Sequence, residues 1–377
     1  MEKGLSLLIY LLINGLFLLK YLPETALNPF TGLVVYSTLI AGVFLLMKYI
    51  SRQLTSTKQQ QLRWPYLLLS LLTVSGILVL HQLIDPMELQ VDRWSAIDHF
   101  LERMLSGEYP YLATTHLGGY GSPFPFWNIF HLPFYLMGDV AIGMTVVVLV
   151  LLISLKKLSG SFERAITYLL FLTLSPAFWY EVAVRSDLLY NFLLCFIICA
   201  WWYRSGINTG RSGFLTGVVS GLLLSSRLSI VIPFFIFLFP GFINSSWKQR
   251  LCFTGTAAGV FLLSFLPFII WDAESLIFFE YNPFVLQSRQ GSILEVVVLL
   301  AMLLPFSLVW KECFDRYTLY TSLTILIFVA VTFMHRMVID NFDSGLFSSR
   351  YDISYFSMAL PFVIWGMTYT MKQKNNL

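Results

Sequence analysis

Residues 65–84 read PYLLLSLLTVSGILVLHQLI, a run of twenty positions without aspartate, glutamate, lysine or arginine. An α-helix rises about 1.5 Å per residue, so about 20 apolar residues are enough to cross the hydrocarbon core of a bilayer. Similar blocks recur along the chain, which has 377 residues, 57% of them hydrophobic and only 12% charged. Soluble domains carry roughly 25% charged residues, so this composition indicates an integral membrane protein.

We count twelve apolar blocks and expect an all-α, polytopic membrane helix bundle of about 12 transmembrane helices. The blocks are residues 4–20, 31–49, 65–84, 139–155, 165–182, 188–203, 213–226, 228–243, 251–270, 292–310, 318–335 and 353–371. The first follows Lys3 as a signal peptide would, but no small-residue cleavage site follows it, so we interpret it as a span. The stretch 126–138 is apolar but too short to span, and we expect Pro133 to break it.

Charge placement predicts the orientation. Threading twelve spans from a cytoplasmic N-terminus puts sixteen of the 24 basic residues on the cytoplasmic side and eight outside, while four of the 21 acidic residues are inside and seventeen outside. Lys and Arg accumulate in cytoplasmic loops, so both termini are expected in the cytoplasm of a multi-pass plasma or inner membrane protein. The net charge of +3 offers no basic field for nucleic acid, and the four cysteines lack metal-site spacing.

The longest loop, 85–138, lies on the external side in this threading. It contains an expected amphipathic helix, 95–106, with a Ser95/Asp98 capping box, an apolar stripe and a terminal Gly107. Such a helix is typical of the membrane interface. Asp92 immediately precedes it, where the helix dipole favours an ionised carboxylate. The alternative for Asp92 is a purely structural role, as a helix-end charge or a partner of Arg93.

Aromatic and charged residues continue on the same side. The segment after the helix combines glycines and prolines with His116, Tyr120 and Trp127, which suits a sugar or a polar headgroup, or else an aromatic belt. Arginines recur at span ends, and the arginine fork matches phosphate oxygens. Arg227 has no acidic neighbour in sequence and is therefore the best phosphate candidate, whereas Arg185 and Asp187 could form a structural ion pair. The candidate phosphate ligands are Arg227, Arg185 and Arg350, and the other candidate substrate contacts are Arg93, His116, Tyr120, Trp127, Asp187, Arg289, His335 and Tyr351.

This order of elements resembles the GT-C superfamily of membrane glycosyltransferases. The shared pattern is a span, an external loop with an early Asp, an interfacial helix ending in Gly-x-Tyr-Pro-Tyr, a proline-aromatic segment and many short-looped spans. It covers roughly residues 65–270. The resemblance implies two juxtamembrane helices, 95–106 and about 126–137, and assigns the catalytic base to Asp92. The chain departs from the pattern in having two spans before the loop-bearing one, and Arg93 stands where some members have a second acid.

We therefore expect one integral membrane domain over residues 1–377. It consists of a two-span hairpin (1–64), a GT-C-like module (65–270) with the external loop, and C-terminal spans (271–377). No cofactor is indicated, although a divalent metal would be compatible with the family.

The resemblance implies inverting transfer of a sugar, hexosyl or pentosyl, from a polyprenyl-phosphate donor to a hydroxyl of a glycan, lipid or protein acceptor. The reaction is expected on the extracytoplasmic face, as in mannosyltransferases of cell-envelope glycans. Asp92 acts as general base in this scheme, with Asp187 as the strongest competing candidate. The alternatives are a transporter or flippase of lipid-linked glycans, whose substrates bind near the midplane in broken helices, and a glycan polymerase or ligase.

Overall fold

The computed structural model describes residues 1–22, 28–53, 59–288, 293–310, 313–341, 346 and 352–369. Within these ranges the chain is helical and has no strand, only an isolated bridge between Thr114 and Tyr120. The α-helices of the first half are α1 (Glu2–Tyr21), α2 (Pro29–Gln53), α3 (Arg63–Leu83), α4 (Arg93–Leu105), α5 (Pro125–Leu136), α6 (Ala141–Ser159), α7 (Phe162–Thr173), α8 (Pro176–Ala183) and α9 (Asp187–Ser205).

The remaining α-helices are α10 (Thr209–Leu224), α11 (Val231–Ile243), α12 (Trp247–Ile277), α13 (Pro283–Ser288), α14 (Ile293–Val309), α15 (Phe314–Asp340) and α17 (Leu360–Met367). Short 3₁₀ turns connect them: η3 (Gln60–Leu62), η4 (Pro86–Glu88), η5 (Pro110–Leu112), η6 (Leu228–Ile230) and η7 (Ile353–Ala359). The described part of each of the twelve apolar blocks falls mainly on a helix or on two consecutive helical pieces. The stretch 213–243 divides at Arg227, as expected from its charge.

Seven of the described helices are long and apolar enough to cross a membrane, or eight if α7 and α8 form one broken span. These helices are α1, α2, α3, α6, α9, α12 and α15. They indicate a multi-pass membrane protein, but they do not confirm the predicted count of twelve. The pieces containing Leu228–Ile243, Leu294–Val309 and Ile353–Met367 are apolar but shorter. A block of apolar residues therefore predicts a helix better than it predicts a complete crossing.

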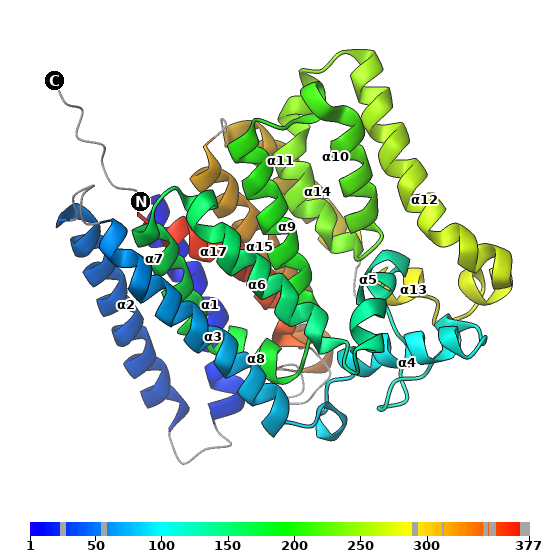
Figure 1. Ribbon diagram of the computed structural model, residues 1–377, viewed down its shortest axis with the longest axis horizontal. Coiled ribbons are helices and arrows are strands. Elements are labelled where there is room, and N and C mark those ends of the chain that lie inside the picture. Colours follow the sequence, from blue (N-terminus) through cyan, green and yellow to red (C-terminus); the bar gives the residue numbers. More distant parts are fainter. Residues whose placement is uncertain are drawn as a thin grey trace.

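The bundle is arranged around α9, the most enclosed of the seven long helices, while α2 and α12 lie at opposite edges (Figure 1). The first and last elements are neighbours, because α1 packs against α17. A Cβ added at Gly366 of α17 would lie 2.5 Å from Oγ of Ser6 in α1. The N-terminal span is therefore built into the core rather than appended to it.

Close helix contact at α10 depends on glycines spaced four residues apart. A Cβ at Gly217 would lie 2.9 Å from the Phe253 carbonyl oxygen of α12, and one at Gly221 would lie 2.5 Å from that of Ala257. Small residues at this spacing let two membrane helices approach until their backbones touch. The α10–α12 pair thereby fixes the segment that follows α10, which contains Arg227.

The break between α7 and α8 turns the chain by 65°. Asn14 of α1 occupies the break: its Oδ1 accepts a hydrogen bond from Oγ of Ser175 at 2.5 Å and from the amide of Ala177 at 3.2 Å. A broken membrane helix needs such partners, because its freed backbone groups find no water in the bilayer core. The bend directs α8 toward the end of the bundle where α4 lies.

The two predicted juxtamembrane helices are present as α4 and α5, within two residues of their predicted bounds. Two details of the prediction are wrong. Asp92, not Ser95, is the N-terminal cap residue of α4, and its side chain makes no capping bond. Pro133 does not break α5, because the helix continues through it to Leu136. Pro133 lies in the last turn of α5, so the backbone hydrogen bond that it removes affects only the C-terminal end of the helix.

Candidate functional site

Asp92 is held by the loop that follows α4. Its Oδ2 accepts a hydrogen bond from Oγ1 of Thr115 at 2.8 Å, and the side chain is partly buried. Its Oδ1 has no hydrogen-bond partner among the described residues. Ser95, freed from the capping role, donates to the backbone oxygen of Asp92 and contacts Nδ1 of His116 at 2.7 Å. The carboxylate is therefore positioned at one oxygen and open at the other.

Gly119 lies directly against this carboxylate. A Cβ at this position would be 3.0 Å from Oδ2 of Asp92 and 3.4 Å from Oγ1 of Thr115. The Gly119 amide also donates to Oγ1 of Thr115 at 3.0 Å, and the Thr115 amide donates to the Gly119 oxygen at 2.8 Å. The loop of Thr115 and Gly119 thus contacts one face of Asp92 and orients its carboxylate.

Asp92 lines a cavity of about 400 Å³ together with Gly118, Gly119, Tyr120, Tyr281 and Leu286. Tyr120 stacks on Tyr281 with ring centroids 5.3 Å apart and an interplanar angle of 11°. Leu286 belongs to α13, which lies beside α4 and α5 at the same end of the bundle (Figure 1). One carboxylate and two aromatic rings therefore face one space. Among the candidate substrate residues that the structure describes, Tyr120 is the one that lines the cavity with Asp92.

His116 and Trp127 are placed differently. The His116 ring is held on both nitrogens, by Ser95 and by the Leu89 oxygen at 2.9 Å. Trp127 is fully buried in α5 and stacks on Phe130 at 5.2 Å. Neither side chain lines the Asp92 cavity, so both help to build the site rather than to face it.

Arg93 links the Asp92 loop to two distant segments. Its Nη1 donates to Oγ of Ser186 at 2.8 Å, its Nη2 pairs with Asp352, and its guanidinium lies 5.3 Å from the ring centroid of Tyr355. Burial alone would raise the pKa of Asp352, but the charges of Arg93 and Lys20 and the hydrogen bond from the Ser354 amide hold it below its usual value. Asp352 therefore remains an ionised partner, and Arg93 is occupied.

Arg227 and Asp187 form a buried bidentate pair. Nε and Nη2 of the arginine donate to the two carboxylate oxygens at 2.8 and 2.7 Å, and the side chains are 8% and 0% exposed. Arg227 has no acidic neighbour in sequence, but Asp187, forty residues earlier, is its partner in the folded chain. Nη1 of Arg227 has no partner among the described residues. The paired geometry also removes Asp187 as a free competing base.

Arg185 pairs with Asp139, not with Asp187. Its Nη1 donates to Oδ2 of Asp139 at 2.8 Å, and its Nη2 donates to the His81 oxygen at 2.5 Å. The residue has a φ of 48°, an uncommon conformation for a residue with a side chain. The turn between α8 and α9 thus directs the Arg185 side chain toward Asp139 and the Asp187 side chain toward Arg227. The expected ion pair between Arg185 and Asp187 is therefore wrong, because each residue pairs with a different partner.

A chain of contacts connects the cavity to these arginines. The Phe124 amide donates to the Ser226 oxygen at 3.1 Å. Gln287 of α13 accepts from the Leu228 amide at 2.7 Å and donates to the Ser122 oxygen at 2.8 Å. Leu286, next to Gln287, lines the cavity. Arg227 therefore lies on the segment that the cavity wall holds in place.

Glu181 is a charged residue that the sequence reading missed. It lies in α8, is fully buried, and neither carboxylate oxygen has a hydrogen-bond partner among the described residues. An acidic residue inside an apolar block is itself a signal of function, because burying a charge in a membrane is costly. Asp139 and Asp352, which hold Arg185 and Arg93, were also absent from the predicted site.

The other predicted residues lie apart or outside the described ranges. His335 of α15 contacts Oε1 of the buried Glu295 through Nδ1 at 3.1 Å. Arg289, Arg350 and Tyr351 lie outside the described residues. No group of three or more His, Cys, Asp or Glu residues in the described part of the chain is arranged to hold a metal ion. The sequence indicated no metal or other cofactor, and this stays a prediction.

The residues described above lie at one end of the bundle, which we call the Asp92 end. The Asp92 end comprises Asp92, its cavity and the pairs formed by Arg93, Arg185 and Arg227. Comparison with known proteins gives no match for this chain, whether to a protein-family model, a curated protein or a solved structure.

Proposed function

We propose that this protein is a membrane glycosyltransferase of the GT-C type. It transfers a sugar from a polyprenyl-phosphate donor to an acceptor hydroxyl on the extracytoplasmic side. The observation that carries the proposal is the Asp92 carboxylate, which lines a cavity of about 400 Å³ beside the stacked rings of Tyr120 and Tyr281. Flat aromatic faces beside a carboxylate suit a sugar with a reacting hydroxyl.

Asp92 acts as the general base in this reaction. Its free Oδ1 takes the proton of the acceptor hydroxyl while the hydroxyl oxygen attacks the anomeric carbon from the face opposite the phosphate. The bond between the anomeric carbon and the phosphate oxygen breaks, and the lipid phosphate leaves with the electron pair. A base positioned in this way accelerates proton transfer by about 10²–10⁴-fold. The hydrogen bond from Thr115 keeps the other oxygen fixed.

The leaving phosphate needs compensating positive charge. Arg227 is the best placed of the arginines, because its Nη1 is not used by Asp187 and the adjacent Leu228 is bonded to the cavity wall through Gln287. Arg93 and Arg185 direct their terminal Nη nitrogens to Asp352, Ser186, Asp139 and backbone oxygens. These two arginines hold the site together in the proposed mechanism.

A transporter of lipid-linked glycans is the second candidate. The broken α7–α8 span and the buried Glu181 favour it, because transporters place charged groups at broken helices. However, Asn14 satisfies the backbone at the break, and the cavity with aromatic walls lies at Asp92 instead. A polymerase or ligase would share the chemistry proposed for Asp92 and differs only in its substrates.

The test is the Asp92→Asn variant, assayed with a panel of radiolabelled polyprenyl-phosphate sugars. This change preserves shape but removes the base, so turnover should fall by about 10²–10⁴-fold while donor binding is retained. Glu108→Gln is the matched control, since Glu108 is an exposed carboxylate on the same loop, paired with Arg103. Turnover of Asp92→Asn within a few-fold of wild type would remove the transferase mechanism, because Asp92 is the one acid among the described residues of the cavity.

A further inference from the structure

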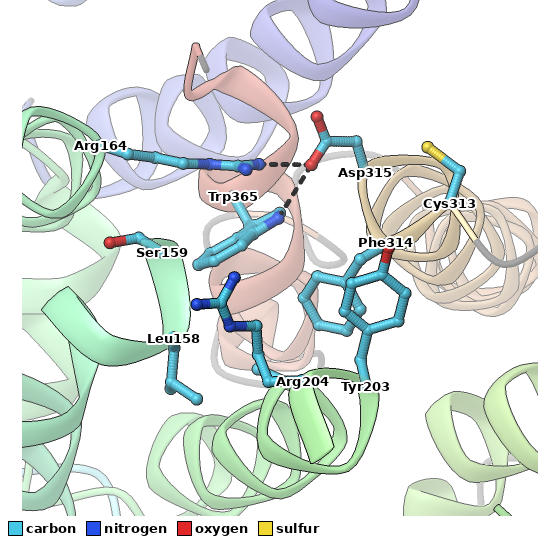
Figure 2. Close-up of a pocket in the computed structure, with 10 residues that line it drawn as sticks. Leu158, Ser159, Arg164, Tyr203, Arg204, Cys313, Phe314, Asp315 and Trp365 are labelled. Carbon is cyan, nitrogen blue, oxygen red and sulfur yellow. Dashed lines mark hydrogen bonds and ion pairs between the residues drawn. The ribbon is translucent and has the colours of Figure 1, made fainter. Parts of the chain in front are cut away.

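A second cavity, of about 300 Å³, lies at the other end of the bundle. It is lined by Leu158, Ser159, Arg164, Ala200, Tyr203, Arg204, Cys313, Phe314, Asp315 and Trp365 (Figure 2). Residues 203 and 204 are at the C-terminal end of α9, whereas Asp187 begins that helix. A helix of 19 residues is about 28 Å long, close to the thickness of a bilayer core, so this cavity lies at the opposite end of α9 from Asp187.

The inner wall of this cavity is a fixed ionic structure. Arg164 pairs with Asp315, donates from Nε to Oγ1 of Thr368 at 2.7 Å, and lies 4.2 Å from the Trp365 ring centroid. Trp365 in turn donates from Nε1 to Oδ1 of Asp315 at 3.1 Å. Figure 2 shows Arg164, Asp315 and Trp365 gathered at one side of the cavity. Asp315 is therefore already neutralised by a buried arginine.

Arg204 is the charged lining residue with no ion pair or hydrogen bond to any described residue. Figure 2 shows its guanidinium pointing into the cavity, on the side of Trp365 away from Arg164. Lys3 adds another positive charge, with Nζ 3.7 Å from Oδ2 of Asp315. The lining thus holds two arginines and one carboxylate, which leaves an excess of positive charge in a space that has an open entrance, since Tyr203, Arg204 and Cys313 are exposed.

We propose that this cavity binds a phosphate monoester and that Arg204 is its principal ligand. The arginine fork matches two phosphate oxygens, and Arg164 adds long-range attraction from the inner wall. The position at the ends of membrane helices, with Tyr203, Phe314 and Trp365 around the entrance, suits the headgroup of a phosphatidic-acid-type lipid. A soluble phosphate ester would offer the same chemistry. The site is independent of Asp92 and of the reaction proposed there.

The experiment measures binding of two probes to the full-length protein in phosphatidylcholine nanodiscs. One probe is phosphatidic acid included in the nanodisc, and the other is inorganic phosphate in solution. Wild type is compared with Arg204→Gln, and Arg211→Gln is the matched control. Arg211 is an exposed arginine at the same end of the bundle, in the first turn of α10, and does not line the cavity.

Arg204→Gln should bind the probe about tenfold more weakly or worse, and Arg211→Gln should stay within about twofold of wild type. Binding of phosphatidic acid alone identifies a lipid site, and binding of inorganic phosphate identifies a soluble ester; both support the proposal if they depend on Arg204. The proposal is overturned if neither probe binds wild type, or if Arg204→Gln loses no more affinity than the control. Equal unfolding temperatures of the variants show that the fold is retained.

Discussion

At the start of α9, Asp187 is fully buried and paired with Arg227, whereas at the end of the same helix Arg204 is exposed and unpaired among the described residues. The Asp92 end matches each of its three arginines with a carboxylate: Arg93 with Asp352, Arg185 with Asp139, and Arg227 with Asp187. The Arg204 end, defined by the residues lining the second cavity, has surplus positive charge.

This contrast indicates two uses of arginine. A buried arginine must be paired, since an isolated charge in the membrane interior is expensive. Such pairs neutralise each of these arginines and tie the segments around Asp92 together, which keeps a reactive carboxylate in place. An arginine at an open helix end can remain unpaired and attract an anion from the membrane surface. This contrast depends on the orientation of the chain, on the pairing of the arginines and on the rigidity of the Asp92 end.

The largest expected effect is an all-or-none difference in thiol labelling between the two ends of the bundle, which lie on opposite sides of the membrane in the expected orientation. Cysteine at position 108, near the Asp92 end, should react with an impermeant thiol reagent in intact cells. Cysteine at position 157, in the last turn of α6, should react only after permeabilisation, because the Arg204 end carries the surplus Lys and Arg.

Both substitutions, Glu108→Cys and Lys157→Cys, are made in a chain with Cys195, Cys199, Cys252 and Cys313 replaced by serine. The reverse labelling pattern would place Asp92 in the cytoplasm. The proposed lipid-phosphate chemistry on the external leaflet would then fail, together with the orientation.

The second prediction tests the buried pair of the Asp92 end. Arg227→Ala should lower the free energy of unfolding by about 3–5 kcal/mol, because it leaves Asp187 charged, buried and alone. The double variant Asp187→Ala/Arg227→Ala should lose less than the sum of the two single variants. Chemical denaturation in detergent measures all three. Strict additivity would mean that the two residues are not coupled and that the Asp92 end is not held by its ion pairs.

The third prediction concerns the placement of Asp92. Gly119→Ala should reduce turnover about tenfold, because the new Cβ would lie 3.0 Å from Oδ2 of Asp92 and must displace the carboxylate. Gly107→Ala is the control. It strains a backbone with φ of 77° in the same loop, but its Cβ would meet no atom within 4 Å. If both variants have the same turnover, the glycine at 119 does not orient Asp92.

The smallest effect is a pH dependence of stability in α4. Burial, with smaller contributions from Glu102 and Asp139, raises the pKa of Asp98 from 3.8 to about 6. The folded state therefore holds this proton more tightly than the unfolded state, so stability from this group is present below about pH 4 and is lost as pH rises toward 6.

Asp98→Asn should accordingly flatten the change in unfolding temperature between acid and neutral pH and raise the unfolding temperature at neutral pH. Glu108→Gln, at an exposed carboxylate, should leave the profile as in wild type. An unchanged profile in Asp98→Asn would show that Asp98 is solvated. The polar face of α4 would then be less enclosed than the structure indicates.

Sequence patterns predicted the local elements well. The helix in the long loop, its end at Gly107 and the division at Arg227 depend on neighbouring residues and on periodicity, and all three are confirmed. The helix near 126–137 was implied by the family resemblance, whereas the residues alone predicted a break at Pro133 that α5 does not show. The start of α4 was placed two residues late, because Ser95 fits a capping motif but hydrogen-bonds to His116 in the folded chain. A cap motif competes with tertiary partners that the local sequence does not reveal.

The sequence by itself determined that this protein is a polytopic helical membrane protein. A long apolar block prefers the bilayer core and must be helical there, whichever residues it later packs against. It also singled out Asp92 and Tyr120, which the structure places on one cavity. Only the tertiary structure decided which acid each arginine meets, that Asn14 holds the broken α7–α8 span, and that Glu181 is buried without a hydrogen-bond partner among the described residues. These contacts join residues from 40 to more than 250 positions apart, and such pairings arise from helix packing rather than from any local pattern.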